Sequence, residues 1–125
     1  MSKSFIFMLM VFCHIIDDYK LQQGLLANLK QKNWWEEHKE YKELYKYDYI
    51  WALIMHSFSW SFMVMLPLAY VMNFNVPFTF VIAFVMNVLV HAFVDDLKAN
   101  RKKINLIQDQ MAHLIQIYVT LMVLL

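Results

Sequence analysis

Histidines and aspartates recur one helical turn apart within apolar stretches of this chain. The pairs are His14 with Asp18, His91 with Asp95, and Asp109 with His113. Residues four apart lie on the same face of a helix, so each pair presents an imidazole and a carboxylate together. A fourth histidine, His56, stands alone in a further apolar stretch. Because imidazole and carboxylate groups bind Zn²⁺, Mn²⁺ and Fe²⁺, this pattern predicts a divalent-metal site.

Ionisable side chains are costly inside membrane-length apolar segments, and such residues are functional candidates. We expect all seven to be metal ligands, with Asp18 as a ligand or as the catalytic general base. They suffice for two metal ions, or for one ion with acids that orient the imidazoles. Gln22 and Gln110 flank the acids and are expected to orient them. The alternatives are a proton or ion pathway, and His–Asp pairs that only hold helices together.

The composition is that of a membrane protein. The chain has 125 residues, of which 61% are hydrophobic, with one Gly and two Pro. Soluble domains are about 45–50% apolar, so we expect a single integral membrane domain over residues 1–125. A net charge of +1 without a basic stripe does not favour nucleic-acid binding. The single cysteine excludes an intrachain disulfide.

Four segments are long enough to span the ~30 Å hydrocarbon core of a bilayer. They cover about residues 5–26, 49–72, 78–97 and 104–125. Asn73 and Pro77 mark a turn between the second and third, and proline suits a helix start. The sequence therefore predicts an all-α fold, an integral membrane four-helix bundle.

The loops after the first and third predicted helices contain nearly all the basic residues, and in a four-span protein they lie on the same side. Basic loops face the cytoplasm, so we expect a multi-pass inner-membrane protein with cytoplasmic charged loops. The loop after the third predicted helix contains four basic residues, Lys98, Arg101, Lys102 and Lys103. Their side chains either bind anionic lipid phosphates or only determine the orientation in the membrane. The expected partners are membrane lipids, and the sequence does not decide whether the chain forms a homo-oligomer.

Aromatic residues in the first loop share one face of a helix. Trp34, His38, Tyr41 and Tyr45 recur at intervals of three to four, with charged residues between them. This pattern predicts an amphipathic helix over about residues 33–46 at the headgroup level. A lid over the polar residues is the alternative.

The depths of the polar residues agree among the four segments. At 1.5 Å per residue, the histidines, Asp18 and Asp109 lie roughly 8 to 18 Å inside the cytoplasmic ends, and Asp95 lies at a shallower level. The outer half is almost wholly apolar. We therefore expect one polar layer in the cytoplasmic half, reached from the cytoplasm or the inner leaflet.

Three motifs resemble, in the same order, the pattern of a domain-of-unknown-function family. They are His14-Ile-Ile-Asp-Asp18-Tyr-Lys-Leu-Gln22, His91-Ala-Phe-Val-Asp95 with Lys98, and Asp109-Gln110-x-x-His113. The family's members are small bacterial and phage membrane proteins with about four helices, so the resemblance implies that fold and assigns no activity. The His56-Ser57 pair and the His/Asp helices also resemble inner-membrane metal-dependent hydrolases, which implies hydrolysis without naming a substrate.

The function expected first is metal-dependent hydrolysis of a lipid-associated or phosphorylated substrate from the cytoplasmic side. An ion or proton transporter or channel is one alternative, and it predicts polar residues that continue into the outer half. A non-enzymatic phage protein that modulates a host membrane partner is the other. In that case, alanine at His91 or His113 leaves the activity intact.

Overall fold

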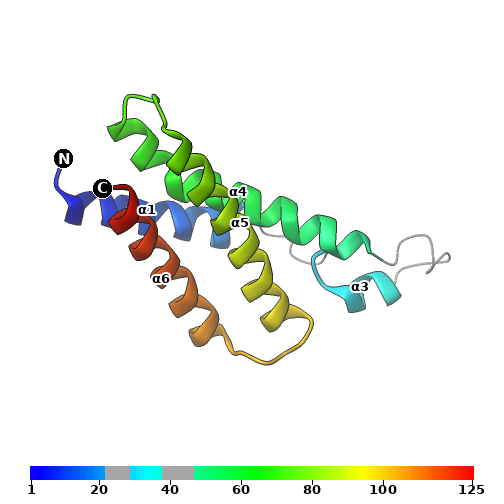
Figure 1. The fold of residues 1–125 in the computed structure, drawn as a ribbon. Coiled ribbons are helices and arrows are strands. Elements are labelled where there is room, and N and C mark those ends of the chain that lie inside the picture. The colour runs from blue at the N-terminus through cyan, green and yellow to red at the C-terminus, as the bar shows by residue number, and fades with distance from the viewer. Residues whose placement is uncertain (22–28, 38–46) are drawn as a thin grey trace.

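The computed structural model describes residues 1–21, 29–37 and 47–125, and in these ranges the chain is all-α (Figure 1). Its elements are α1 (Lys3–Ile16), the π-helical turn η1 (Asp17–Leu21), α3 (Lys32–Glu37), α4 (Asp48–Val71), α5 (Phe78–Ala99) and α6 (Leu106–Leu124). The last three helices begin and end within two residues of the predicted bounds. Of the predicted amphipathic helix, α3 covers the beginning, and residues 38–46 lie outside the described residues.

The first segment differs from the single helix expected over residues 5–26, because α1 ends at Ile16 and a π-helical turn follows. A π-helical turn holds more residues than an α-helical turn and often occurs at functional sites. Here it carries both Asp17, which is fully buried, and Asp18, whose side chain is 12% exposed. Asp17 accepts a hydrogen bond from the Ser59 hydroxyl at 2.8 Å inside the protein.

Local sequence explains two helix starts. α6 begins with a capping box, in which Asn105 and Gln108 each bond the other's backbone N–H through their side chains, at 2.9 and 3.0 Å. The turn before α5 places Asn73 and Phe74 at positive φ, 54° and 61°, and Pro77 directly precedes the helix. The turn at Asn73–Pro77 and the helix start after Pro77 are as predicted.

The long helices pack in a closed order, with α4 and α6 each lying against both α1 and α5. Both chain termini and the α4–α5 turn lie at one end of the molecule, and the α5–α6 connection lies at the other (Figure 1). The apolar core is built from Ile6, Met10, Trp60, Val64, Leu68, Ile117 and Leu121. Most of these residues lie toward the end that carries the termini, which leaves the other end of the interior to polar side chains.

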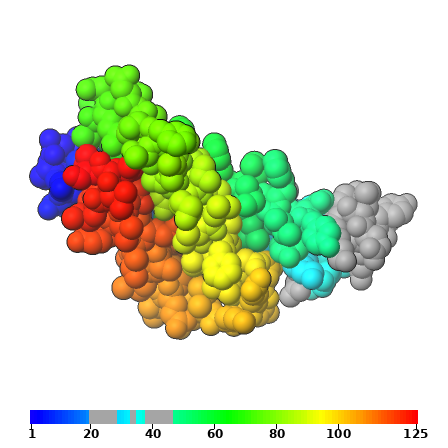
Figure 2. Space-filling model, viewed as in Figure 1, coloured from blue at the N-terminus to red at the C-terminus, as the bar shows by residue number. Residues whose placement is uncertain are grey.

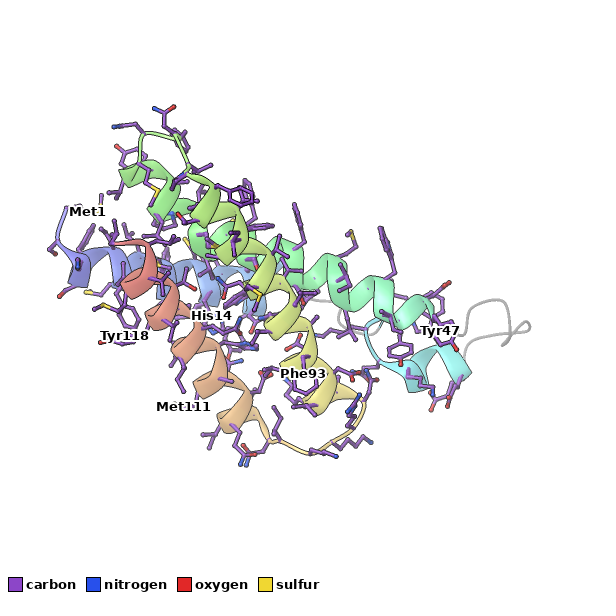
Figure 3. The ribbon with its side chains drawn as sticks, in the orientation of Figure 1. Met1, His14, Tyr47, Phe93, Met111 and Tyr118 are labelled. Carbon is purple, nitrogen blue, oxygen red and sulfur yellow. The ribbon has the colours of Figure 1, made fainter. Side chains whose placement is uncertain are left out.

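The distribution of polarity is the reverse of that in a water-soluble protein. The interior holds His14, His56, His91, Asp95, Asp109 and His113, each at most 2% exposed. The outer faces of the helices are apolar: Met111 and Tyr118 point away from the interior, and His14 points into it (Figure 3). α5 alone exposes Val81, Ile82, Val85, Met86, Leu89, Val90 and Phe93, and Figure 2 shows α5 and α6 side by side at the surface. Contiguous apolar surface of this kind marks contact with a membrane or a partner.

Two helices, α4 and α5, are long and apolar enough to cross a membrane. The 14 residues of α1 would reach about 21 Å, short of a ~30 Å hydrocarbon core. α6 has 19 residues, but the polar run Gln108–Gln110 near its start lowers its mean hydropathy. The membrane-spanning four-helix bundle therefore stays a prediction, while the all-α fold is confirmed.

Candidate metal centre

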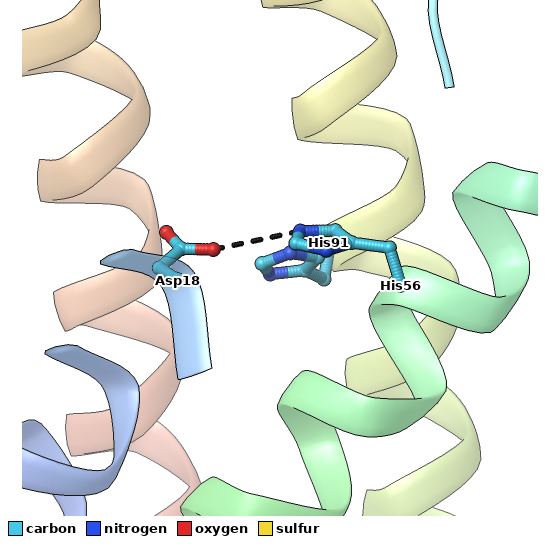
Figure 4. A group of neighbouring side chains, drawn as sticks. All are labelled: Asp18, His56 and His91. Carbon is cyan, nitrogen blue, oxygen red and sulfur yellow. Dashed lines mark ion pairs between the residues drawn. The ribbon is translucent and has the colours of Figure 1, made fainter. Parts of the chain in front are cut away.

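The structure brings the seven histidines and aspartates singled out from the sequence into one cluster. They are His14 on α1, Asp18 on η1, His56 on α4, His91 and Asp95 on α5, and Asp109 and His113 on α6. Two groups have ligand atoms within 4.8 Å of one another and could hold a metal ion: Asp18 with His56 and His91 (Figure 4), and His91 with Asp95 and His113. Gln22 lies outside the described residues.

Asp95 lies at the centre of the cluster. Its Oδ1 is 3.4 Å from Nε2 of His113. Its Oδ2 is 3.0 Å from Nε2 of His56 and 3.6 Å from Nε2 of His91. This one carboxylate therefore contacts imidazoles from three helices.

A network of buried amides fixes the orientation of Gln116, one turn beyond His113. Gln116 Nε2 donates to the backbone carbonyl of Asn87 at 3.3 Å and to its Oδ1 at 3.1 Å. Asn87 Nδ2 in turn donates to the Thr120 hydroxyl at 2.8 Å, which itself donates to the Gln116 carbonyl at 2.7 Å. A carbonyl can only accept. Gln116 must therefore direct its NH₂ group to Asn87 and its Oε1 to His113.

This orientation determines which nitrogen of His113 carries the proton. Nδ1 of His113 lies 3.1 Å from Gln116 Oε1, an acceptor, so Nδ1 is the donor. In the neutral imidazole, Nε2 then carries the lone pair. It lies 3.3 Å from Asp109 Oδ1 and 3.4 Å from Asp95 Oδ1. The lone pair thus faces two carboxylate oxygens in a buried position, which is costly unless a proton or a metal cation lies between them.

The separations suit a metal ion. Metal–ligand bonds of about 2.0–2.1 Å in tetrahedral geometry place the ligand atoms roughly 3.3–3.4 Å apart. The distances from His113 Nε2 to the two carboxylate oxygens are 3.3 and 3.4 Å. Asp109 Oδ1 and His113 Nε2 are also buried atoms that have no hydrogen-bond partner among the described residues.

His91 forms a possible metal-binding group with Asp95 and His113. It is fully buried and stacks against both Trp60 and His113, with ring centroids 4.3 and 4.1 Å away. Within the described part of the chain, neither of its nitrogens has a hydrogen-bond partner. Buried polar atoms are satisfied in the great majority of cases. The imidazole is therefore held rigidly with a nitrogen available to a ligand near Asp95.

His14 differs because both of its nitrogens are occupied. Trp60 Nε1–H, which can only donate, bonds to His14 Nδ1 at 2.7 Å. Nε2 of His14 therefore holds the proton and donates to Gln110 Oε1 at 2.8 Å. Gln110 is oriented by its own NH₂ group, which donates to Asp18 Oδ2 at 3.3 Å and Asp109 Oδ2 at 3.1 Å. No lone pair of His14 remains for a metal, and this histidine anchors Gln110 instead.

Replacing Trp60 by phenylalanine tests this role. The phenyl ring keeps the stack on His91 but leaves the buried Nδ1 of His14 without its donor. We expect Trp60→Phe to lower the free energy of unfolding by about 1–3 kcal/mol, the cost of an unsatisfied buried group. Thermal or denaturant unfolding in detergent measures it, with Trp51→Phe, 67% exposed on the same helix, as the control. Equal stability of the two variants would contradict the assignment.

Two lysine side chains contact the cluster, and the sequence pattern does not predict these contacts. Lys30 Nζ donates to Asp95 Oδ2 at 2.8 Å and lies 3.4 Å from His56 Nε2. Lys98 Nζ lies 3.5 Å from Asp109 Oδ2. Each of the two acids beside His113 thus presents Oδ1 to the imidazole and Oδ2 to an ammonium group.

The other basic residues named for lipid binding lie at the α5–α6 connection. Arg101 pairs with Asp96 at 3.2 Å, and its guanidinium lies 5.9 Å from the Phe93 ring centroid. Lys102 and Lys103 are exposed. Lys98 and Arg101 therefore bind carboxylates of the protein itself, while the two exposed lysines have their side chains in solvent.

Fold and site together define an all-α protein with buried His/Asp groups that could hold a metal ion. Residues 6–125 match the family described as "Protein of unknown function (DUF3307)", and the chain belongs to this family. The resemblance to a domain-of-unknown-function family is confirmed, and no hydrolase family is shown. Neither the curated proteins nor the solved structures include a match.

Proposed function

We propose that the protein binds one divalent cation, Zn²⁺, Mn²⁺ or Fe²⁺, and hydrolyses a phosphate ester at a membrane surface. The proposed ligands are His91, Asp95 and His113, which could hold a metal ion together, and Asp109, which lies 3.3 Å from His113. The observation that carries the proposal is the lone pair of His113, which the buried amides direct at two carboxylate oxygens. Imidazole and carboxylate donors in this combination suit these three metals.

The position of Lys30 favours one cation over two. Its ammonium group lies beside His56 Nε2 and Asp95 Oδ2, where a second cation between His56, Asp18 and Asp95 would sit. Two positive charges there would repel each other strongly in a buried setting. His56 and Asp18 are therefore left outside the ligand set, free to handle protons.

Asp18 is the residue we assign to proton transfer. Its side chain is 12% exposed, whereas those of Asp95 and Asp109 are nearly closed to solvent. Oδ1 lies 3.5 Å from His56 Nε2, and Oδ2 accepts from Gln110. A carboxylate held in this way can take a proton from an attacking water.

The reaction balances with these groups. A divalent cation supplies Lewis-acid polarisation of a phosphoryl oxygen and a more acidic water. Water forms the new P–O bond, and the bond from phosphorus to the ester oxygen breaks. Asp18 takes one proton of the water and returns it to the leaving oxygen, which departs as an alcohol. The second proton remains on the phosphate.

The inverted polarity supports placing this chemistry in a membrane, with α4, α5, α6 and the continuous segment of α1 and η1 crossing it. An apolar exterior around a polar interior is what a lipid environment favours. The exposed Lys102 and Lys103 at the α5–α6 connection would then face anionic headgroups on the cytoplasmic side.

The extent of the polar interior bears on the transport alternative. The polar column reaches farther than the sequence predicted, through Gln116 and Asn87 to Thr120. Asn87 also contacts the Met65 sulfur at 3.6 Å, and Leu68, one turn farther along α4, belongs to the apolar core. In the described part of the chain apolar residues thus follow the polar column toward the end that carries the termini, which favours a one-sided site.

Metal analysis tests the proposal. Protein purified in detergent without chelator is expected to contain about one equivalent of metal, or to take it up from added Zn²⁺ or Mn²⁺. His113→Gln should lose this stoichiometric metal. His14→Gln is the matched control, because it removes a buried histidine whose nitrogens are already bonded, and it should retain the metal.

Phosphate release from phosphatidic acid in mixed micelles and from free pyrophosphate then measures hydrolysis. Activity should require the metal and disappear in His113→Gln. If the wild-type protein neither contains nor takes up metal, a proton fills the position at His113 and the cluster is an ion-paired structural core. That result would overturn the proposal.

A further inference from the structure

Lys30 is the one described residue outside the long helices and η1 that donates a hydrogen bond into the His/Asp cluster. Its side chain is 15% exposed, so it lies between the buried acids and the solvent. Nζ contacts Asp95 at 2.8 Å and His56 at 3.4 Å. A lysine that only marked membrane topology would keep its ammonium group in water.

The backbone of Lys30 is tied to the end of α5. Asn100 Nδ2 donates to the Lys30 carbonyl at 3.1 Å, and Asn100 Oδ1 accepts from the backbone N–H of Lys32 at 2.6 Å. Asn100 is itself held by Asp96 at 2.7 Å. The backbone of Lys30 is thus held by bonds that do not involve the cluster, and it would stay in place when the ammonium group changes its partner.

The charge of the cluster reverses when a divalent cation binds. The carboxylates of Asp18, Asp95 and Asp109 and the ammonium groups of Lys30 and Lys98 leave one net negative charge while the imidazoles are neutral. A divalent cation turns this into one net positive charge. It also competes with Lys30 for Asp95, because the carboxylate then has a stronger cation beside it.

We propose that Lys30 is a substrate-binding residue, which holds an anionic phosphoryl oxygen once the cation is in place. This inference rests on the proposed function. A phosphate monoester supplies the negative charge that the loaded cluster lacks, and the ammonium group exchanges its bond to Asp95 for one to the phosphoryl oxygen. The cluster therefore recognises phosphate only in its metal-loaded form.

Because coupling between two ligands is reciprocal, phosphate must raise the affinity for the metal. We expect inorganic phosphate to tighten Mn²⁺ binding to the wild-type protein in detergent by about 10-fold, within the usual range of such coupling. Titration followed by electron paramagnetic resonance of free Mn²⁺ measures this. Phosphatidic acid micelles against phosphatidylcholine micelles form a second arm, which separates a lipid headgroup from free phosphate as the source of the anion.

Lys30→Met should reduce the coupling to less than about 2-fold while Mn²⁺ alone binds as well as, or better than, in the wild type. Lys30→Arg keeps the charge and should retain part of the coupling, which guards against misfolding of the methionine variant. Lys32→Met is the control, since Lys32 is exposed on the same segment.

If Mn²⁺ binds but its coupling to both phosphate sources survives in Lys30→Met, the role of Lys30 is overturned and the metal site stands. If the wild-type protein binds none of Zn²⁺, Mn²⁺ and Fe²⁺, the proposed function fails, and the role of Lys30 fails with it. A protein that binds only Zn²⁺ or Fe²⁺ is titrated with that metal instead.

Discussion

Asp95→Asn is expected to abolish metal binding and hydrolysis while keeping the size of the side chain. Asp95 contacts three imidazoles and Lys30, and no other described side chain bridges as many of the cluster's groups. Loss of an orienting partner costs about 10–100-fold in metal affinity. Loss of the central carboxylate should exceed about 100-fold, and phosphate release should fall to background.

The same replacement should destabilise the metal-free protein. It leaves the Lys30 ammonium group, 15% exposed, without its counter-charge. Breaking a buried ion pair on one side costs about 3–5 kcal/mol in the free energy of unfolding. Adding Lys30→Met removes the unpaired charge, so the double variant should recover much of this stability and none of the metal binding.

This double-mutant cycle separates the two roles of Asp95. Asp96→Asn is the matched control, because Asp96 is the adjacent acid and pairs with Arg101, which is 55% exposed. A surface pair of this kind contributes less than about 1 kcal/mol, and metal affinity should not change. If Asp95→Asn binds metal with the affinity of the wild type, the cluster is a structural ion-pair network and the proposed metal site is wrong.

Spacing was enough to predict which histidines and aspartates lie together. One-turn pairs such as His91 and Asp95 must share a helix face, and equal depths along the helices bring such pairs to the same level. The same reasoning could not separate His14 from His113. Their difference comes from Trp60 and Gln116, residues on other faces or other helices whose partners only the packed structure defines.

Other parts of the site carry no local sequence signal. Asn87, Gln116 and Thr120 bond across α5 and α6, and a polar residue in an apolar helix does not reveal whether a partner faces it. Lys30 is 65 residues from Asp95 along the chain and resembles any other loop lysine. The π-helical turn that carries Asp18 follows an unbroken apolar run, so a continuous α-helix was the natural expectation.

Gln116→Leu is expected to weaken metal binding although it changes no ligand. Gln116 Oε1 accepts the Nδ1 proton of His113 and so leaves the lone pair on Nε2. Without it, the proton can move to Nε2, and the imidazole loses its orientation. The expected fall in metal affinity is 10–100-fold, the usual effect of removing such a partner. Metal titration of the purified variant measures it.

The effect should decrease along the network. Thr120→Val keeps the shape of the side chain but removes the hydroxyl that orients Asn87, one step farther from His113. Thr120→Val should therefore lower the metal affinity by less than about 10-fold, a smaller loss than that expected for Gln116→Leu. Thr79→Val is the control, because this threonine is exposed at the start of α5.

If Gln116→Leu lowers the stability of the protein without lowering its metal affinity, the role of Gln116 in metal binding is contradicted. Gln116→Leu leaves the His113 Nδ1 proton and the Asn87 side-chain Oδ1 without partners, which costs about 1–3 kcal/mol for each buried group. If that cost appears while metal binding stays at the wild-type level, the amides serve only to join α5 and α6. A graded loss of affinity from Gln116 to Thr120, with none at Thr79, would instead mean that the two helices set the protonation of His113 for a cation.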